Sequence, residues 1–151
     1  MYAVQIAAGM GAHVTATGLP AQAAFVGQMG AERFIDVTAE AFDQTLSGLD
    51  VVLDTVGGAT LDRSYGVLRA GGRLVTLGAP PTRELADRYG VQGMFFVVRP
   101  DRGELQHLAR LVDDGQLEAV VSQTFPLADG RRAYESGRQH RRPGKTVLVV
   151  R

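Results

Sequence analysis

Apolar residues follow two patterns along the chain, and each pattern predicts one kind of secondary structure. Apolar residues three or four positions apart are typical of a helix with one buried face, whereas short apolar runs are typical of buried strands. Helical spacing predicts helices near residues 3–10, 25–29, 39–46, 61–68, 105–112 and 129–137. Short apolar runs predict strands at residues 13–17, 33–36, 50–54, 73–77, 94–98, 120–125 and 146–150. A Pro-Pro pair and several charges predict a surface connection over residues 79–90.

Glycines and a capping residue mark the boundaries of these elements. Gly71 and Gly72 are expected to turn the chain into the strand at 73–77. Asp101 is expected to cap the helix at 105–112, because its carboxylate can accept a hydrogen bond from a free N–H of the first helical turn.

The order of the elements predicts an α/β fold. Strands that alternate with helices through short links form parallel sheets by right-handed crossovers. The run from Val51 to Leu53 has no polar alternation, which is typical of a strand buried on both faces. We therefore expect one domain over residues 1–151, with an open, doubly wound parallel sheet that binds ligands at the carboxyl ends of its strands.

Composition limits the classes of function that fit this sequence. With 151 residues, 45% of them hydrophobic, the chain is long enough for one core. Lys and Arg number 16, as do Asp and Glu, which argues against nucleic acid or a membrane surface as the main partner. The absence of cysteine excludes disulfides, thiolate zinc sites and a cysteine nucleophile, and the three scattered histidines predict no metal site. We also expect no signal peptide, no membrane span and a cytoplasmic location.

Five segments of the sequence, in order and at natural spacing, resemble one enzyme superfamily. They are AVQIAAGMGAHVTATG, MGAERFIDVTAE, LDVVLDTVGG, LRAGGRLVTLGAP and GKTVLVV. Together they resemble the medium-chain dehydrogenase/reductase superfamily, in particular its zinc-independent, quinone oxidoreductase-like branch. The resemblance covers nearly the whole chain and implies a Rossmann-like domain, the carboxy-terminal cofactor-binding half of an oxidoreductase. It further implies NADP(H) rather than NAD(H), a carbonyl, enone or quinone substrate, and a homodimer paired through the edge strand at 94–98.

The chain departs from that superfamily at its start. Relatives have a strand and a glycine-rich phosphate-binding turn before the helix that reads AVQIA here, and this sequence contains no G-x-G-x-x-G. The resemblance therefore implies a sheet without its first, central strand, and a separate catalytic domain against which residues 120–151 would pack. Because unpaired strand edges are costly, a non-catalytic module that acts through a partner chain or by self-association stays open. A methyltransferase-like Rossmann enzyme also stays open, although the ending GKTVLVV does not suit it.

Two groups of residues are predicted to contact the cofactor. Thr17 and Gly18 end the strand at 13–17 without an acid that could accept from a ribose 2′-hydroxyl, which favours NADP over NAD. No Lys or Arg follows them before Gln28 to bind a 2′-phosphate, and Val37 stands where many relatives have a tyrosine. The resemblance implies that the ends of the later strands contact the ribose and nicotinamide. These residues are Asp54, Thr55, Val56, Gly57, Leu77, Gly78, Ala79, Phe96, Val97 and Val98.

Structural roles compete with these functional interpretations. Gly18 can simply end a strand, Thr55 or Thr60 can cap the next helix, and Asp54 can interact with the dipole of that helix. Core packing is the ordinary role of residues such as Phe95 and Phe96.

Basic residues are densest near the carboxyl end of the sequence. This basic stretch contains Arg138, His140, Arg141, Arg142 and Lys145. The resemblance places Lys145 near the cofactor phosphates, and a solvated loop is the alternative. The sequence predicts no catalytic acid. In particular it lacks the Tyr-x-x-x-Lys pair of short-chain dehydrogenases, because Arg stands four residues after both Tyr65 and Tyr134.

Overall fold

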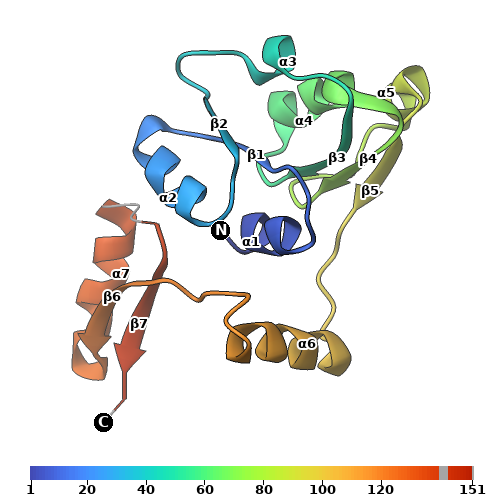
Figure 1. Ribbon diagram of the computed structural model, residues 1–151. Helices are drawn as coiled ribbons and strands as arrows, with labels where there is room; N and C mark the ends of the chain where they lie inside the picture. Colours follow the sequence, from blue (N-terminus) through green and yellow to red (C-terminus); the bar gives the residue numbers. More distant parts are fainter. Residues whose placement is uncertain (140–142, 151) are drawn as a thin grey trace. The chain divides into compact units, whose positions relative to one another are not determined.

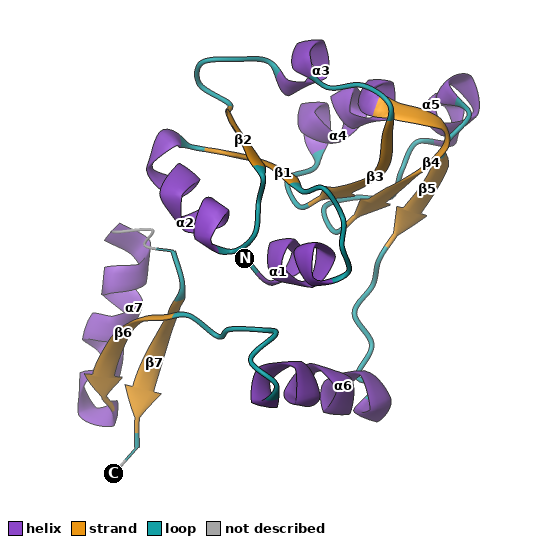
Figure 2. Ribbon diagram, viewed as in Figure 1, coloured by secondary structure: helices purple, strands orange, loops and turns teal. Residues whose placement is uncertain are grey.

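The computed structural model describes residues 1–139 and 143–150, which fold as two compact units. Unit 1 comprises Met1–Asp36 and Asp101–Arg151, and unit 2 comprises Val37–Pro100. Figure 1 labels the helices and strands along the chain, and Figure 2 separates them by colour.

Unit 1 contains two small parallel sheets and the helices that connect their strands. Its elements are α1 (Tyr2–Gly9), β1 (Thr15–Gly18), η1 (Pro20–Gln22), α2 (Ala23–Gln28), β2 (Arg33–Asp36), α6 (Arg102–Asp113), β6 (Val121–Pro126), η3 (Leu127–Asp129), α7 (Gly130–Gln139) and β7 (Lys145–Val149). Strand β1 pairs with β2, and β6 pairs with β7. The Asp101 carboxylate accepts a hydrogen bond from the Glu104 N–H at 2.8 Å, so the predicted cap of α6 is confirmed.

Unit 2 is built on one parallel sheet of three strands in the order β3-β4-β5. Its elements are α3 (Phe42–Thr45), β3 (Leu49–Asp54), α4 (Gly58–Ser64), η2 (Tyr65–Val67), β4 (Leu68–Thr76), α5 (Arg83–Tyr89) and β5 (Gln92–Phe95). The last residues of the three strands are in register, since Asp54 lies opposite Thr76 and Thr76 lies opposite Phe95. The carboxyl ends of β3, β4 and β5 therefore meet at one edge of the sheet.

Tyr65 lies at the centre of the core of unit 2. Its side chain is fully buried in a cluster with Leu61, Leu68, Leu74 and Val91. The hydroxyl donates to the Thr82 carbonyl oxygen at 3.4 Å, and the ring stacks on Tyr89 with centroids 6.3 Å apart. Burial raises the pKa of Tyr65 above its ordinary value. The spacing that predicted a buried helical face at 61–65 is confirmed, but Leu68 belongs to β4.

The prediction of a surface connection over residues 79–90 is wrong. This segment contains helix α5, which begins after Thr82 and ends at Gly90, where φ is +62°. The Pro-Pro pair at 80–81 lies before the helix and does not interrupt it. Leu85 and Ala86 pack against the core cluster, which stabilises this short helix in spite of its many charges.

Strands β4 and β5 begin and end earlier than predicted. Gly71 and Gly72 lie inside β4, where the register with β3 shifts between Leu49 and Val51. Gly72 has little space around it, because a Cβ there would lie 2.9 Å from the Arg69 carbonyl oxygen and 3.1 Å from that of Leu49. Strand β5 ends at Phe95. Residues 96–98 therefore come after the last strand of this sheet and are not part of it.

The predicted fold class is confirmed, but the prediction of one continuous sheet is wrong. The structure is α/β, and every strand pair in the described ranges is parallel. These pairs form three sheets, β1-β2, β3-β4-β5 and β6-β7.

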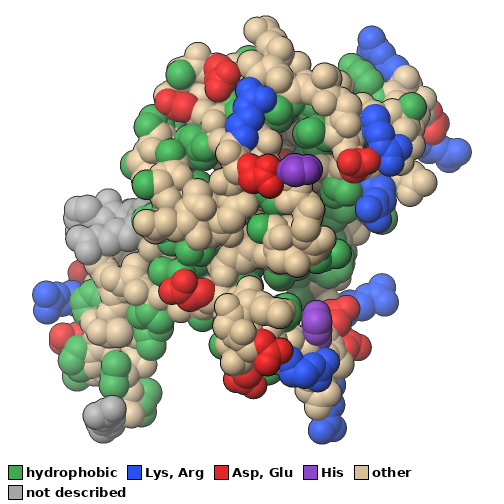
Figure 3. Space-filling model, viewed as in Figure 1, with side chains coloured by type: hydrophobic (Ala, Val, Ile, Leu, Met, Phe, Trp, Pro, Cys, Tyr) green, Lys and Arg blue, Asp and Glu red, His purple; other side chains and the backbone are tan. Residues whose placement is uncertain are grey.

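Charged side chains of both signs are scattered over the face drawn in Figure 3. This arrangement fits the zero formal net charge of the chain. Over residues 1–139 and 143–150, no helix combines the length and apolar character that crossing a membrane requires.

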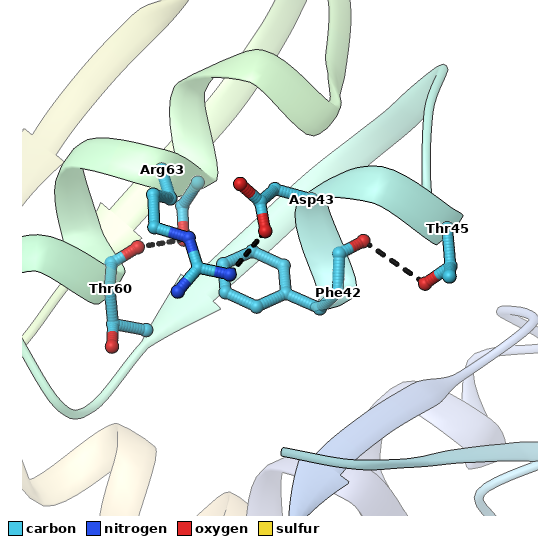
Figure 4. A network of polar contacts seen from close by, with 6 residues as sticks. Phe42, Asp43, Thr45, Thr60 and Arg63 are labelled. Atoms are coloured by element: carbon cyan, nitrogen blue, oxygen red, sulfur yellow. Dashed lines mark hydrogen bonds and ion pairs between the residues drawn. The ribbon is translucent and has the colours of Figure 1, made fainter. Parts of the chain in front are cut away.

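A polar network joins α3 to α4 in unit 2 (Figure 4). The Arg63 guanidinium donates to the Asp43 carboxylate and lies 4.9 Å from the centre of the Phe42 ring. This hydrogen bond holds the pKa of Asp43 below its usual value and raises that of Arg63. Because both charges are exposed to solvent, the ion pair itself contributes little stability. It orients α4, whose start lies beside the edge where the strands of unit 2 end.

Candidate functional site

A buried carboxylate organises the turn that follows β3. The Asp54 side chain is 4% exposed, and its oxygens accept three hydrogen bonds. The donors are the Thr76 hydroxyl at 2.8 Å, the Gly57 N–H at 3.1 Å and the Val56 N–H at 3.2 Å. The carboxylate is thus turned inward, toward its own turn and the neighbouring strand.

Thr76 extends this network into the turn that follows β4. Its side chain is completely buried, and its hydroxyl oxygen accepts from the Gly78 N–H at 3.1 Å and the Ala79 N–H at 3.5 Å. The Leu77 N–H donates to the Asp54 carbonyl oxygen at 2.9 Å. The two turns are therefore joined by side-chain and main-chain hydrogen bonds.

Two glycines allow the main chains of these turns to touch. A Cβ on Gly78 would lie 3.0 Å from the Gly57 Cα and 3.1 Å from its nitrogen. Gly57 has φ +78° and ψ −168°, a conformation that essentially only glycine adopts without strain. Val56 and Leu77, the residues before the two glycines, are 72% and 46% exposed. The edge of the sheet thus presents main chain flanked by two apolar side chains.

The segment after β5 reaches the same edge. The Phe96 N–H donates to the Thr76 carbonyl oxygen at 3.0 Å. Phe96, Val97 and Val98 are all exposed, so the core-packing alternative for Phe96 is not what the structure shows. The predicted site residues from Asp54 to Val98 all belong to unit 2, and the contacts above join those of the β3 and β4 turns and Phe96.

The other predicted site residues belong to unit 1. Thr17 and Gly18 end β1, and Gly18 lies opposite Asp36, the last residue of β2. The Lys145 ammonium lies 5.5 Å from the centre of the Tyr2 ring, and Tyr2 is the first residue of α1. Lys145 is therefore placed at the amino-terminal end of that helix. His140, Arg141 and Arg142 lie outside the described residues.

A side-chain amide holds α1 in place within unit 1. The Gln5 amide donates to the Glu118 carbonyl oxygen at 3.1 Å and accepts from the Glu118 N–H at 2.7 Å. These paired hydrogen bonds connect α1 to the segment between α6 and β6. No local pattern predicts this contact, because the two residues are 113 positions apart.

The prediction that Thr55 or Thr60 caps α4 is wrong. Gly57 occupies the capping position, and among the described residues no side chain caps this helix. The Thr60 carbonyl oxygen accepts from the Ser64 hydroxyl at 2.8 Å. The Asp54 carboxylate instead accepts from the N–H groups of Val56 and Gly57, which precede the helix.

One further residue of interest was not singled out in the sequence. Thr76 is a polar residue inside an apolar strand, one position before the Leu77-Gly78 turn, and that position was a usable signal. Asp36 ends the strand predicted at 33–36, and the parallel register sets it beside Gly18.

The arrangement of metal-binding residue types gives no support for a bound metal ion. Within residues 1–139 and 143–150, no three His, Asp or Glu side chains are grouped so that they could hold one. The described residues therefore do not fit a zinc site.

Comparison with protein families gives a match over most of the chain. The family model described as zinc-binding dehydrogenase matches residues 29–148. The match includes the β3 and β4 turns and Lys145.

Individual relatives cover almost the whole chain. Polyketide synthase GfsB from Streptomyces halstedii is 34% identical over 99% of this chain, which corresponds to 3% of that protein. The mitochondrial NAD(P)H oxidoreductase RTN4IP1 from Danio rerio is 28% identical over 99% of this chain and 46% of its own length. The solved structure of the quinone oxidoreductase from Coxiella burnetii superposes with a TM-score of 0.84 at 28% identity, over 99% of this chain and 49% of that one. The chain thus spans about half, or much less, of the length of these relatives.

Proposed function

The chain belongs to the zinc-binding dehydrogenase family of the medium-chain dehydrogenase/reductase superfamily, and we propose that it is the cofactor-binding half of an NADP(H)-dependent oxidoreductase. The observation that carries this proposal is the pair of joined turns at the ends of β3 and β4. The main chains of Gly57 and Gly78 lie so close that a Cβ on Gly78 would be 3.0 Å from the Gly57 Cα, and a main chain without a Cβ allows a ligand to approach closely. The names of the relatives, an NAD(P)H oxidoreductase and a quinone oxidoreductase, support the same class of cofactor.

Unit 1 would bind the adenosine and phosphate end of the cofactor. The N–H groups at the start of α1 and the Lys145 ammonium beside Tyr2 both favour an anion. Thr17 and Gly18 would lie along the adenosine ribose. The lack of an acidic residue at 17–19 supports NADP(H) over NAD(H). The acidic residue nearest to this strand end in the sheet register is Asp36, which lies opposite Gly18.

Unit 2 would bind the ribose and nicotinamide end. Gly57 and Gly78 would let the ligand approach the main chain, and Val56, Leu77 and Val98 would exclude water from the ring. When bound, the cofactor supplies a hydride, and the substrate class we propose is a quinone, enone or carbonyl compound. The role of this chain is to bind and orient, and none of its residues is assigned as a proton donor.

We expect the purified chain to bind NADPH with saturation and to bind NADH more weakly. Nicotinamide fluorescence in a titration measures both affinities under identical conditions. Lys145→Met, which keeps the length of the side chain, should weaken NADPH binding because it removes a positive charge near the phosphates. Arg131→Met, an exposed arginine paired with Glu135, is the control and should leave binding unchanged. Absence of binding at millimolar NADPH would contradict the proposal.

The free edge of β5 supports a homodimer. Among residues 1–139 and 143–150, β4 is the strand that pairs with β5, and Met94 and Phe95 are both partly exposed. We expect Met94→Lys to convert a dimer to a monomer, because it places two charges in the paired edge. Light scattering measures the mass, and Leu105→Lys on the exposed face of α6 is the control. A monomeric wild-type chain would contradict this assignment.

Residues 120–151 are proposed to pack against a further domain. Val147, Leu148 and Val149 of β7 are partly exposed. Neighbouring apolar side chains on a strand are typical of a surface that a partner covers.

A further inference from the structure

We infer that Asp54 and Thr76 are positioning residues that turn the carbonyl groups of both strand-end turns toward the nicotinamide half of the cofactor. The inference rests on the proposed function, because it assigns the chemistry of the same edge of the sheet. It differs from the sequence-based expectation, in which Asp54 itself contacts the ligand. The Asp54 carboxylate is buried and already accepts three hydrogen bonds.

The direction of each hydrogen bond follows from the groups involved. An ionised carboxylate can only accept, so the Thr76 hydroxyl donates its single proton to Asp54. The oxygen of that hydroxyl is then left to accept from the N–H groups of Gly78 and Ala79. The N–H groups of Val56 and Gly57 are likewise directed at Asp54. Four backbone N–H groups therefore point inward, toward one buried pair of side chains.

Peptide geometry then fixes the direction of four carbonyl groups. In a trans peptide the C=O points opposite to the N–H of the next residue, and the described residues contain no cis peptide. The carbonyl groups that share a peptide with the four inward N–H groups therefore point away from Asp54 and Thr76. They belong to Thr55, Val56, Leu77 and Gly78, and all four residues are exposed.

This edge of the sheet is consequently rich in hydrogen-bond acceptors. Its complement is a ligand with several donors, such as the two hydroxyls of a ribose and the NH2 group of a carboxamide. The nicotinamide riboside half of NADPH carries both kinds of donor. An acidic or phosphate group would be repelled by the same carbonyl oxygens, so the phosphates belong elsewhere.

Thr76 offers the cleanest pair of variants. Thr76→Val keeps the volume of the side chain but removes the hydroxyl, which releases the Gly78 and Ala79 N–H groups and one bond to Asp54. Thr76→Ser keeps the hydroxyl and serves as the matched control. The two ligands are NADPH and adenosine 2′,5′-bisphosphate, which lacks the nicotinamide half.

We expect Thr76→Val to weaken NADPH binding by about tenfold, the effect of losing one to two hydrogen bonds. Its affinity for adenosine 2′,5′-bisphosphate should stay that of the wild type, and Thr76→Ser should bind NADPH within about threefold of the wild type. Unchanged NADPH binding by Thr76→Val would overturn the inference. An equal loss of affinity for NADPH and for adenosine 2′,5′-bisphosphate would also overturn it, because such a loss indicates general destabilisation. Wild-type protein that binds neither ligand would instead overturn the proposed function.

A second variant covers the case in which Thr76→Val does not fold. Asp54→Asn keeps the shape of the side chain, but its NH2 group faces a donor, either the Thr76 hydroxyl or a backbone N–H. The same selective loss of NADPH binding is expected. If Asp54→Asn folds and binds NADPH like the wild type, the inference is wrong.

Discussion

Replacing Gly78 with alanine is expected to weaken NADPH binding at least about tenfold and to lower the free energy of unfolding by about 1–3 kcal/mol. The new Cβ would lie 3.0 Å from the Gly57 Cα and 3.1 Å from the Gly57 nitrogen. These are backbone atoms, and the hydrogen bonds to Asp54 hold them in place. The two turns must therefore move apart, which disturbs the surface that the proposed ligand contacts. Fluorescence titration and urea unfolding measure the two effects.

Gly27→Ala is the control for this substitution. Gly27 lies inside α2, where a Cβ would meet no atom within 4 Å. Alanine in a helix interior is more favourable than glycine by about 0.5–1 kcal/mol, so this variant should be slightly more stable and bind normally. If Gly78→Ala binds NADPH as the wild type does, the glycine contact plays no part in cofactor binding.

Tyr65→Ala should lower the free energy of unfolding by about 3–5 kcal/mol. The substitution leaves a cavity between Leu61, Leu68, Leu74 and Val91, because the ring it removes is fully buried among them. It also removes the stacking on Tyr89. Equilibrium unfolding in urea measures the loss, and cooperativity of the transition shows whether unit 2 still folds.

Tyr65→Phe separates the ring from its hydroxyl. It removes only the hydrogen bond to the Thr82 carbonyl oxygen, which is long at 3.4 Å. We expect a cost of at most about 1 kcal/mol. A loss as large as that of Tyr65→Ala would mean that the hydroxyl, and not the packed ring, stabilises this core.

The sequence predicted elements where local signals are strong. Strand β3, which contains the apolar run at 51–53, and helix α6, which has both an apolar spacing and Asp101 before it, lie where expected. The expectation that this run is buried on both faces is wrong, because Val51 and Leu53 are 45% and 44% exposed. Helix α5 was missed because two prolines and many charges are typical of loops. The packing of Leu85 and Ala86 on the core, which is a tertiary contact, stabilises it, and Gly90 with φ +62° ends it.

The site was predicted at the level of its position but not of its internal contacts. The turns at Gly57 and Gly78 were predicted as part of the site because they follow strands, and ligands of parallel sheets bind at the carboxyl ends of the strands. The hydrogen bond between Thr76 and Asp54 depends on the register of two strands, 22 residues apart in sequence. A single sequence carries no direct signal of that register.

The division into units has a consequence for synthesis on the ribosome. Unit 2 is one continuous stretch, Val37–Pro100, so all its partners are present once that stretch has emerged. Unit 1 is interrupted, and contacts such as that of Gln5 with Glu118 join its first and last parts. During translation, residues 1–36 therefore cannot form these contacts until the chain beyond residue 100 has been synthesised. The faces that the contacts cover stay exposed until then. Unit 2 can thus complete its core while residues 1–36 still lack these contacts.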